Sequence, residues 1–191
     1  MQQKDEYQLI NIFDLIETET LDFVLDDISE FKSSRNDDVE NFLKNSAVSF
    51  CKLKQSITYL LYDKTGFLNA YFTLAFKVLD LPVSNLSTTL LKKVERFGHK
   101  NGDILQLPCV LIAQLSKNYS SSEQISGKVL MEYVWNALKQ IQRLIGGGFV
   151  FLECEKEKSN LLSKYSSYGF VSVNERDSAD GKPLVQLIKK L

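Results

Sequence analysis

The sequence contains little cysteine and histidine, and this scarcity argues against several kinds of site. Its 191 residues include three cysteines and one histidine. Cys51, Cys109 and Cys154 are odd in number and far apart, which argues against a disulfide framework and against a zinc site. We expect each to be a small buried apolar residue, and we predict no metal site. Any Ser-His or Cys-His relay would depend on His99, which no partner motif surrounds, so we expect it at the surface.

An excess of charge of one sign is also lacking. The 23 Lys and Arg residues nearly balance the 24 Asp and Glu residues, for a net charge of −1. Such a balance gives no global attraction to nucleic acid or to a membrane, although a local basic patch remains compatible with it. Nucleic acid is therefore a less favoured partner class, with tRNA kept as an alternative.

Long apolar runs are absent as well. No run reaches the roughly 18 residues of a membrane-spanning helix. The N-terminal stretch "MQQKDEYQLINIFDL" has no basic region followed by a long apolar core, as a secretory signal would. We therefore expect a cytoplasmic protein without a membrane partner. A chain of this length is expected to form one domain, over residues 1–191.

Hydrophobic periodicity predicts strands and helices in alternation. The predicted strands are Tyr7–Phe13, Ser56–Asp63, Phe67–Leu79, Leu105–Leu115, Phe149–Glu155 and Leu184–Leu191. The predicted helices run from Leu21 to Phe31, from about Asn36 to Leu53, from Leu86 to Phe97, from the Ser126 region to about Arg143, and from Ser159 to Phe170.

A β-loop-α-β unit lies in the second half of the chain. Strand Leu105–Leu115, the following helix and strand Phe149–Glu155 form a crossover, so the two strands should be parallel. The loop between strand and helix, "KNYSSSEQISGKVL" (Lys117–Leu130), is rich in small hydroxyls. A helix N-terminus at the carboxyl edge of a sheet binds phosphate through free amides. As an alternative, the spacing Ser120-x-x-Glu123 predicts a capping box that merely starts the helix.

Several segments resemble the GNAT superfamily of acyl-CoA N-acyltransferases. "DVENFLKNSAVSF", "TYLLYD" and "NAYFTLAF" are similar to the opening elements of bacterial members, including the subgroup that contains toxin acetyltransferases. "LIAQLSKNY" is similar to the family's fourth strand, which pairs with the pantetheine arm. Tyr165, Gly169 and Phe170 match the family's Tyr-x-x-x-Gly-Phe. The resemblance implies an α/β fold: a mixed, largely antiparallel sheet with one parallel βαβ crossover and helices on both faces.

The resemblance also implies acetyl-CoA as cofactor and a primary amine, on a small molecule or a protein, as acceptor. The implied cofactor-binding residues are Leu115, Ser116, Lys117, Ser122, Gln124, Ser126, Gly127 and Lys128. The chain departs from the family's usual pyrophosphate loop, Arg/Gln-x-x-Gly-x-Gly/Ala, because both motif glycines are missing and Glu123 adds negative charge. One alternative is therefore a GNAT-fold interaction protein without productive CoA binding.

Two residues are implied as catalytic. By match to the family, Tyr165 protonates the departing CoA thiolate; the alternative is a core aromatic, since Leu161, Leu162 and Tyr168 share its helical stripe. Glu153, twelve residues earlier, is implied as the base that deprotonates the amine. Its apolar strand should desolvate the carboxylate and raise its pKa. The alternative for Glu153 is an exposed sheet-edge residue or a structural ion pair.

The segment Leu86–Lys100 is longer than the usual GNAT link and contains Lys92, Lys93, Arg96 and Lys100. Such a charged run is usually a solvated helix face. It also suits an acidic substrate, RNA, or the contact of a homodimer. A toxin-type enzyme that acetylates aminoacyl-tRNA is accordingly a further alternative to a general amine acetyltransferase.

Overall fold

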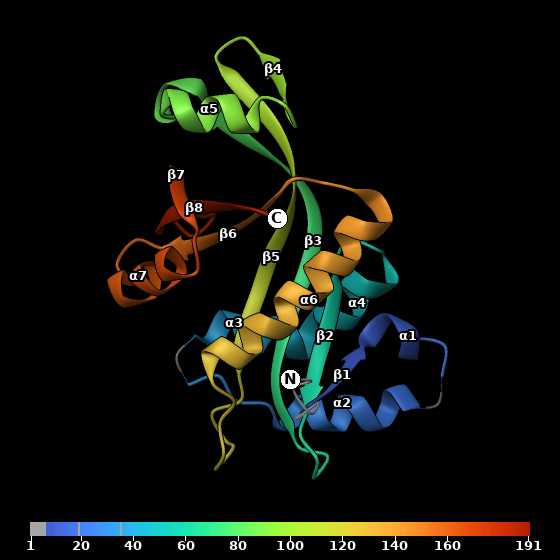
Figure 1. Ribbon diagram of the computed structural model, residues 1–191. Coiled ribbons are helices and arrows are strands. Elements are labelled where there is room, and N and C mark those ends of the chain that lie inside the picture. Colours follow the sequence, from blue (N-terminus) through green and yellow to red (C-terminus); the bar gives the residue numbers. More distant parts are fainter. Residues whose placement is uncertain (1–6, 19, 35) are drawn as a thin grey trace, which may run out of the picture. The chain divides into compact units, whose positions relative to one another are not determined.

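Two long strands, β3 (Leu68–Pro82) and β5 (Ile104–Lys117), organise the computed structural model, which describes residues 7–18, 20–34 and 36–191 (Figure 1). The chain divides into two units. Unit 1 comprises Met1–Ala75 and Ala113–Ala137, and unit 2 comprises Phe76–Ile112 and Leu138–Leu191. β3, β5 and the longest helix, α6 (Gly127–Ile145), each run through both units. The single domain expected over residues 1–191 stays a prediction.

The strands form a mixed sheet in the order β1-β2-β3-β5-β6-β8-β7, with β4 paired to β5. The β5–β6 pair is parallel, with Val110 opposite Val150, and the β1–β2, β2–β3, β4–β5, β6–β8 and β7–β8 pairs are antiparallel. This arrangement confirms the predicted fold class. The remaining strands are β1 (Gln8–Asn11), β2 (Ile57–Tyr62), β4 (His99–Asn101), β6 (Phe149–Glu155), β7 (Val171–Asp177) and β8 (Pro183–Lys190).

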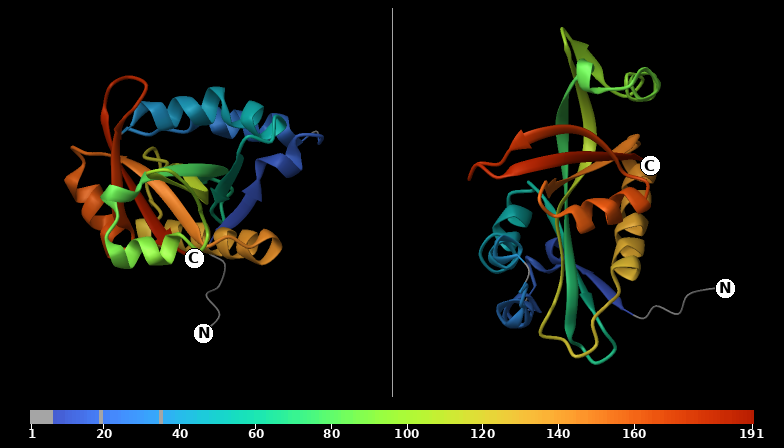
Figure 2. Two further views of the ribbon diagram at one scale, coloured as in Figure 1. Left: turned by 90° about the horizontal axis from the view of Figure 1, so that it is seen from above. Right: turned by 90° about the vertical axis from the view of Figure 1, so that its left-hand side faces the viewer.

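Unit 1 packs its helices on both faces of its strands. In Figure 2, α2 and α3 lie on one side of β2 and β3, and the first half of α6 lies on the other. The core between the N-terminal helices and the strands includes Phe31, Leu43, Cys51, Leu60 and Tyr71, each at most 1% exposed. The helices here are α1 (Ile12–Leu15), α2 (Thr20–Glu30), α3 (Asp37–Asn45) and α4 (Ala47–Lys52).

The single helix predicted from Asn36 to Leu53 is divided at Ser46. Asn36 caps the first part, because its Oδ1 accepts a hydrogen bond from the Asp38 N–H at 3.0 Å. The second part begins at Ala47, which is fully buried together with Cys51 on the core side.

Unit 2 has its own core, which includes Leu79, Leu105, Phe149 and Ile188. The predicted helix Leu86–Phe97 is shorter in the structure: a 3₁₀ turn at Val83–Asn85 precedes α5 (Thr88–Val94). Ser87 fixes this start, since its Oγ accepts the Leu90 N–H at 3.3 Å. His99 is exposed in β4, a short strand that the periodicity did not predict. The last helix of the unit is α7 (Ser159–Ser167).

All three cysteines are buried and free, as expected. No helix within the described residues is long and apolar enough to cross a membrane.

Candidate functional site

The serine-rich loop of unit 1 ends on a side-chain cap at Ser126. Its Oγ accepts a hydrogen bond from the Val129 N–H at 3.2 Å, and its carbonyl accepts one from the Leu130 N–H at 3.0 Å. α6 therefore starts at Gly127, and Gly127 and Lys128 occupy the first turn, where amides have no partner within the helix. Ser122, Gln124 and Lys128 are exposed, while Ile125 is 1% exposed and anchors the loop to the core.

The alternative of a capping box at Ser120 and Glu123 is wrong. The Ser120 hydroxyl donates to Asn118 Oδ1 at 2.7 Å, and the Glu123 N–H donates to the hydroxyl of Ser121 at 3.2 Å. Both residues are thus engaged in local turns four or more residues before the helix proper. The loop has a folded shape of its own, with small exposed side chains directly ahead of a helix N-terminus.

Asn118 fixes the point where β5 leaves the sheet and the loop begins. This residue is 2% exposed, its Nδ2 donates to the Leu68 carbonyl at 2.9 Å, and its Oδ1 accepts from the Lys32 N–H at 3.2 Å. Next to it, Ser116 is buried and its hydroxyl donates to Ser33 Oγ at 3.1 Å, while Leu115 and Lys117 are half-buried. All eight residues predicted to bind the cofactor lie in unit 1, on the end of β5, the loop and the first turn of α6.

Tyr165 lies on α7 in unit 2. It is half-buried, and so are Leu162 and Tyr168 of the same stripe, while α7 has no fully buried residue. The catalytic role of Tyr165 and the alternative of a core aromatic both stay predictions. Burial, with smaller contributions from Cys154 and Tyr168, raises the pKa of the Tyr165 hydroxyl above its usual value. The hydroxyl therefore keeps its proton at neutral pH, as a proton donor must.

Gly169 and Phe170 hold Tyr165 in place by ending the helix. Gly169 has φ +86°, and the Phe170 N–H donates to the Tyr165 carbonyl at 3.1 Å. This is the Schellman pattern, in which glycine takes the left-handed position. The chain then turns back, so that the Phe170 ring, 3% exposed, meets the Tyr165 ring edge-on with centroids 5.9 Å apart.

The Glu153 carboxylate is held in an ion pair. Arg176 donates from Nε to Oε1 at 2.7 Å and from Nη2 to Oε2 at 2.6 Å, and Gln186 Nε2 donates to Oε1 at 2.7 Å. Burial alone raises the pKa of this carboxyl, but the hydrogen bonds from Arg176 and Gln186 and the charge of Arg176 outweigh it, so the pKa lies below its usual value. The expectation of a raised pKa is wrong. The role of Glu153 as base stays a prediction, with the ion pair weighing against it.

Glu153 and Tyr165 have different partners. The Glu153 carboxylate is bonded to Arg176 of β7 and Gln186 of β8, whereas the Tyr165 ring lies against the Phe170 ring. Among the described residues, no hydrogen bond joins the two predicted catalytic side chains.

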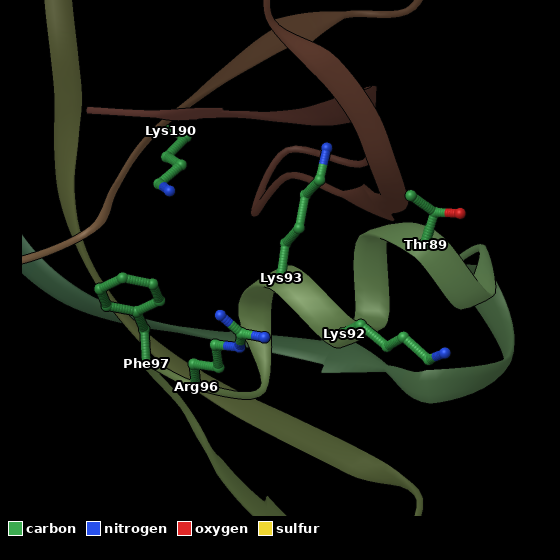
Figure 3. A pocket seen from close by; sticks show the side chains of 6 residues that line it. All are labelled: Thr89, Lys92, Lys93, Arg96, Phe97 and Lys190. Atoms are coloured by element: carbon green, nitrogen blue, oxygen red, sulfur yellow. The ribbon is translucent and has the colours of Figure 1, made fainter.

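The basic residues of the segment after β3 line a cavity of about 400 Å³ in unit 2 (Figure 3). Lys92, Lys93 and Arg96 follow Thr89 at helical spacing, and Lys190 enters from β8. Phe97 completes the lining. Val94 of α5 is buried in the core, while Lys92, Lys93 and Arg96 are exposed, so the basic residues form a solvated face as the charged run suggests.

No protein-family model matches the chain, and no curated protein matches it in sequence. Solved structures match it over almost its whole length. AtaT complexed with acetyl-methionyl-tRNAfMet is 18% identical at a TM-score of 0.64, over 94% of this chain and 93% of that chain. A tyrosine-to-phenylalanine variant of KacT is 17% identical at a TM-score of 0.66, over 97% and 95%. AtaTR bound with acetyl-CoA is 16% identical at a TM-score of 0.61, over 98% and 94%. The chain has the GNAT fold.

Within this GNAT fold, sequence reasoning missed four residues that define the candidate sites: Asn118, Arg176, Gln186 and Lys190. Each acts across a large sequence separation; Arg176 and Gln186, for example, reach Glu153 from 23 and 33 positions away. An asparagine three residues after the predicted strand Leu105–Leu115 was the one available signal, because Asx side chains commonly fix turns.

Replacing Glu153 with glutamine tests its ion pair. We expect the free energy of unfolding at pH 7 to fall by about 1–3 kcal/mol, the usual contribution of hydrogen bonds to a charged group. Because the folded-state pKa is lowered, this contribution is complete above the unfolded-state pKa of about 4.3 and is lost as pH falls through the folded-state pKa. Urea denaturation of wild type and variant between pH 7 and pH 3 should therefore converge in acid.

Glu175→Gln is the matched control, since Glu175 pairs with Lys156 at an exposed position and should contribute about 1 kcal/mol or less. Unchanged stability of Glu153→Gln, together with a loss of turnover that recovers as pH rises, would instead support the base role.

Proposed function

We propose that this protein transfers the acetyl group of acetyl-CoA to the α-amino group of an aminoacyl-tRNA. The observation that carries the proposal is the match over nearly the whole of both chains to AtaT, whose structures contain acetyl-CoA or acetyl-methionyl-tRNAfMet. The basic cavity on a chain of net charge −1 supports RNA as the carrier of the acceptor amine. The proposal thus replaces the unspecified primary amine expected from the sequence with the α-amino group of an aminoacyl-tRNA.

The chemistry needs an amine without its proton and a protonated leaving group. The amine nitrogen attacks the thioester carbon, its surplus proton passes to solvent, and the C–S bond breaks. Tyr165 donates its hydroxyl proton to the departing CoA sulfur and is reprotonated by solvent. The hydroxyl carries its proton over the whole physiological range, and burial, by raising its pKa, makes it a weaker acid than a tyrosine in water.

The paired state of Glu153 favours an α-amine over a lysine side chain. An α-amino group has a pKa of about 7.7–8.0, so roughly a tenth of it or more is already neutral at pH 7. A lysine amine, with a pKa near 10.4, is neutral in only about 0.04% of molecules. A carboxylate held by Arg176 is a poor base, and the α-amine is the acceptor that depends least on one.

Acetyl-CoA is proposed to bind at the end of β5 and the serine-rich loop, through Leu115, Ser116, Lys117, Ser122, Gln124, Ser126, Gly127 and Lys128. The loop with its exposed small side chains supports this, since the amides of Gly127 and Lys128, in the first turn of α6, have no partner within the helix. Lys128 supplies a positive charge in the first turn of the helix. The cofactor's thioester supplies the activated acetyl group.

Gly127→Asp is expected to weaken acetyl-CoA binding by about tenfold or more, because it places a negative charge where amides meet phosphate. Isothermal titration calorimetry measures the affinity directly. Gly127→Asn, of similar size without the charge, is the control and should lose less. Wild-type affinity in a folded Gly127→Asp protein would show that the loop serves only to start α6.

The function is tested by incubating the protein with acetyl-CoA and methionyl-tRNA and identifying the N-acetylated aminoacyl ester by mass spectrometry. Uncharged tRNA and a lysine-containing peptide with a blocked N-terminus serve as negative controls. Absence of acetylated product, despite acetyl-CoA binding, would refute the proposal. Absence of acetyl-CoA binding at millimolar concentration would favour the alternative of a GNAT-fold interaction protein.

A further inference from the structure

The cavity beside α5 is lined by residues of that helix, by the turn that follows it and by the end of β8. Thr89, Lys92, Lys93 and Arg96 recur at positions i, i+3, i+4 and i+7, which places them on one face of a helical segment. Lys190 comes from a site 94 positions after Arg96 in the chain and points into the same opening (Figure 3). The cavity therefore depends on tertiary structure and is not only a local charged run.

The positive charge of this cavity is not compensated. Among the described residues, neither Lys92, Lys93, Arg96 nor Lys190 forms an ion pair. Other cations do pair with carboxylates: Lys32 and Lys44 with Glu40, Lys156 with Glu175, Lys158 with Glu155, Arg176 with Glu153, and Lys182 with Asp180. Four unpaired cations around one cavity repel each other, and an anion that enters it relieves that repulsion.

Phe97 gives the cavity a fixed aromatic wall. Its side chain is 42% exposed, and its ring meets the Phe149 ring edge-on with centroids 5.5 Å apart. Gly148 leaves room for this ring, since a Cβ at that position would lie 2.5 Å from two Phe97 ring atoms. The ring is thus held from one side and accessible from the cavity.

Lysines and an arginine bind phosphate, and an accessible aromatic ring stacks with a nucleobase. A volume of about 400 Å³ suits a single nucleotide and not a duplex. Lys190 lies opposite Phe149 in the β6–β8 register, on the same face of the sheet, so a cation and the aromatic pair lie side by side. Side chains suited to a phosphate and to a base therefore lie within one cavity.

We propose that this cavity binds one unpaired nucleotide of the tRNA substrate, with its base on Phe97 and its flanking phosphates on Lys93, Arg96 and Lys190. The proposal rests on the proposed function for the identity of the RNA, and it assigns a separate task, holding the RNA, to residues that take no part in acetyl transfer.

The test measures the affinity of wild type and variants for fluorescently labelled, uncharged tRNA by anisotropy at several salt concentrations. The variant Lys93→Gln/Arg96→Gln/Lys190→Gln is expected to bind at least about tenfold more weakly. The slope of log affinity against log salt should fall in magnitude by about 2, since each of three contacts to single-stranded phosphate contributes about 0.7. The matched control is Lys64→Gln/Lys77→Gln/Lys100→Gln, which removes three exposed charges outside the cavity.

The aromatic part is tested by Phe97→Leu, which keeps apolar packing on Phe149 and removes the flat ring. We expect about fivefold or more loss of tRNA affinity, and Phe97→Trp should restore it. Equal losses in the cavity variant and the charge-matched control would overturn the proposal, because they would indicate general charge attraction. A fall in acetyl-CoA affinity in the cavity variant would also overturn it, by assigning the cavity to the cofactor.

Measurements of acetyl transfer distinguish a failure of this proposal from a failure of the proposed function. Cavity variants should raise KM for methionyl-tRNA and leave kcat unchanged. Acetylation by wild type with unaltered tRNA binding by the variants refutes the cavity and leaves the function in place. Cavity-dependent tRNA binding without any acetylation refutes the function and supports the cavity. If wild type does not bind tRNA even at low salt, both are wrong, and binding of adenosine monophosphate alone would identify a site for free nucleotides.

Discussion

Tyr165→Phe is expected to lower turnover of methionyl-tRNA by roughly 10²–10⁴-fold, the usual contribution of a positioned general acid. The substitution removes only the hydroxyl, so the edge-on contact with Phe170 and the helix end at Gly169 are retained. Acetyl-CoA affinity and the free energy of unfolding should therefore stay close to those of wild type. Steady-state kinetics with calorimetry on the same preparations measure both properties.

Tyr168→Phe is the control for this experiment. Tyr168 is half-buried on the same helix, and the contact that it makes to Lys189 uses its backbone carbonyl, which accepts from Nζ at 2.6 Å. Loss of its hydroxyl should leave turnover nearly unchanged. Near wild-type turnover of Tyr165→Phe would show that Tyr165 only packs against its neighbours, and the leaving thiolate would then need another proton source.

The Tyr165 region shows which features the sequence alone can predict. The pattern Tyr-x-x-x-Gly-Phe includes a glycine that ends the helix and a phenylalanine that folds back onto the tyrosine ring. The structure realises both within six residues, through the positive φ of Gly169 and the buried Phe170 ring. Local backbone preferences decide this arrangement, and the same holds for the Asn36 cap and for most strands of the sheet.

The start of α6 was harder to predict because two local patterns compete for it. Ser120 with Glu123 and Ser126 with its following turn are both plausible caps. The buried side chain of Asn118, which takes the Ser120 hydroxyl, decides in favour of Ser126. That choice depends on Leu68 and Lys32, which hold Asn118 from distant parts of unit 1 and which no local pattern indicates.

Glu153 and the α5 cavity show where prediction from sequence fails for a physical reason. The apolar neighbours of Glu153 correctly indicate desolvation, but the sign of its pKa shift is decided by Arg176, a residue of another strand. In the same way the basic run Lys92–Arg96 is visible in the sequence, whereas its conversion into a cavity needs Lys190 and the space left by Gly148. Pairing partners across strands are set by register, and register is a property of the whole sheet.

At pH 7 the protein is expected to acetylate an α-amine roughly 10²–10³-fold faster than an ε-amine presented on the same RNA. The two acceptors are methionyl-tRNA and a lysyl-tRNA whose α-amine is blocked. Glu153, the residue predicted as base, is paired with Arg176 and has a lowered pKa, so it is a poor proton acceptor. The rate therefore depends on the fraction of the amine that is already neutral. The neutral fractions of the two amines differ by several hundredfold at this pH.

The same comparison as a function of pH separates amine ionisation from simple fit. Between pH 7 and pH 8.5 the neutral fraction of the α-amine rises about sixfold and that of the ε-amine about thirtyfold, so the preference should narrow by about fivefold. Single-turnover rates with saturating acetyl-CoA measure it, and Glu153→Gln serves as the control, since it should leave both pH dependences unchanged. A preference that stays constant with pH would mean that acceptor geometry sets it. An ε-amine rate that is independent of pH in wild type and becomes pH-dependent in Glu153→Gln would identify Glu153 as a working base after all, and the ion pair with Arg176 as one that opens during the reaction.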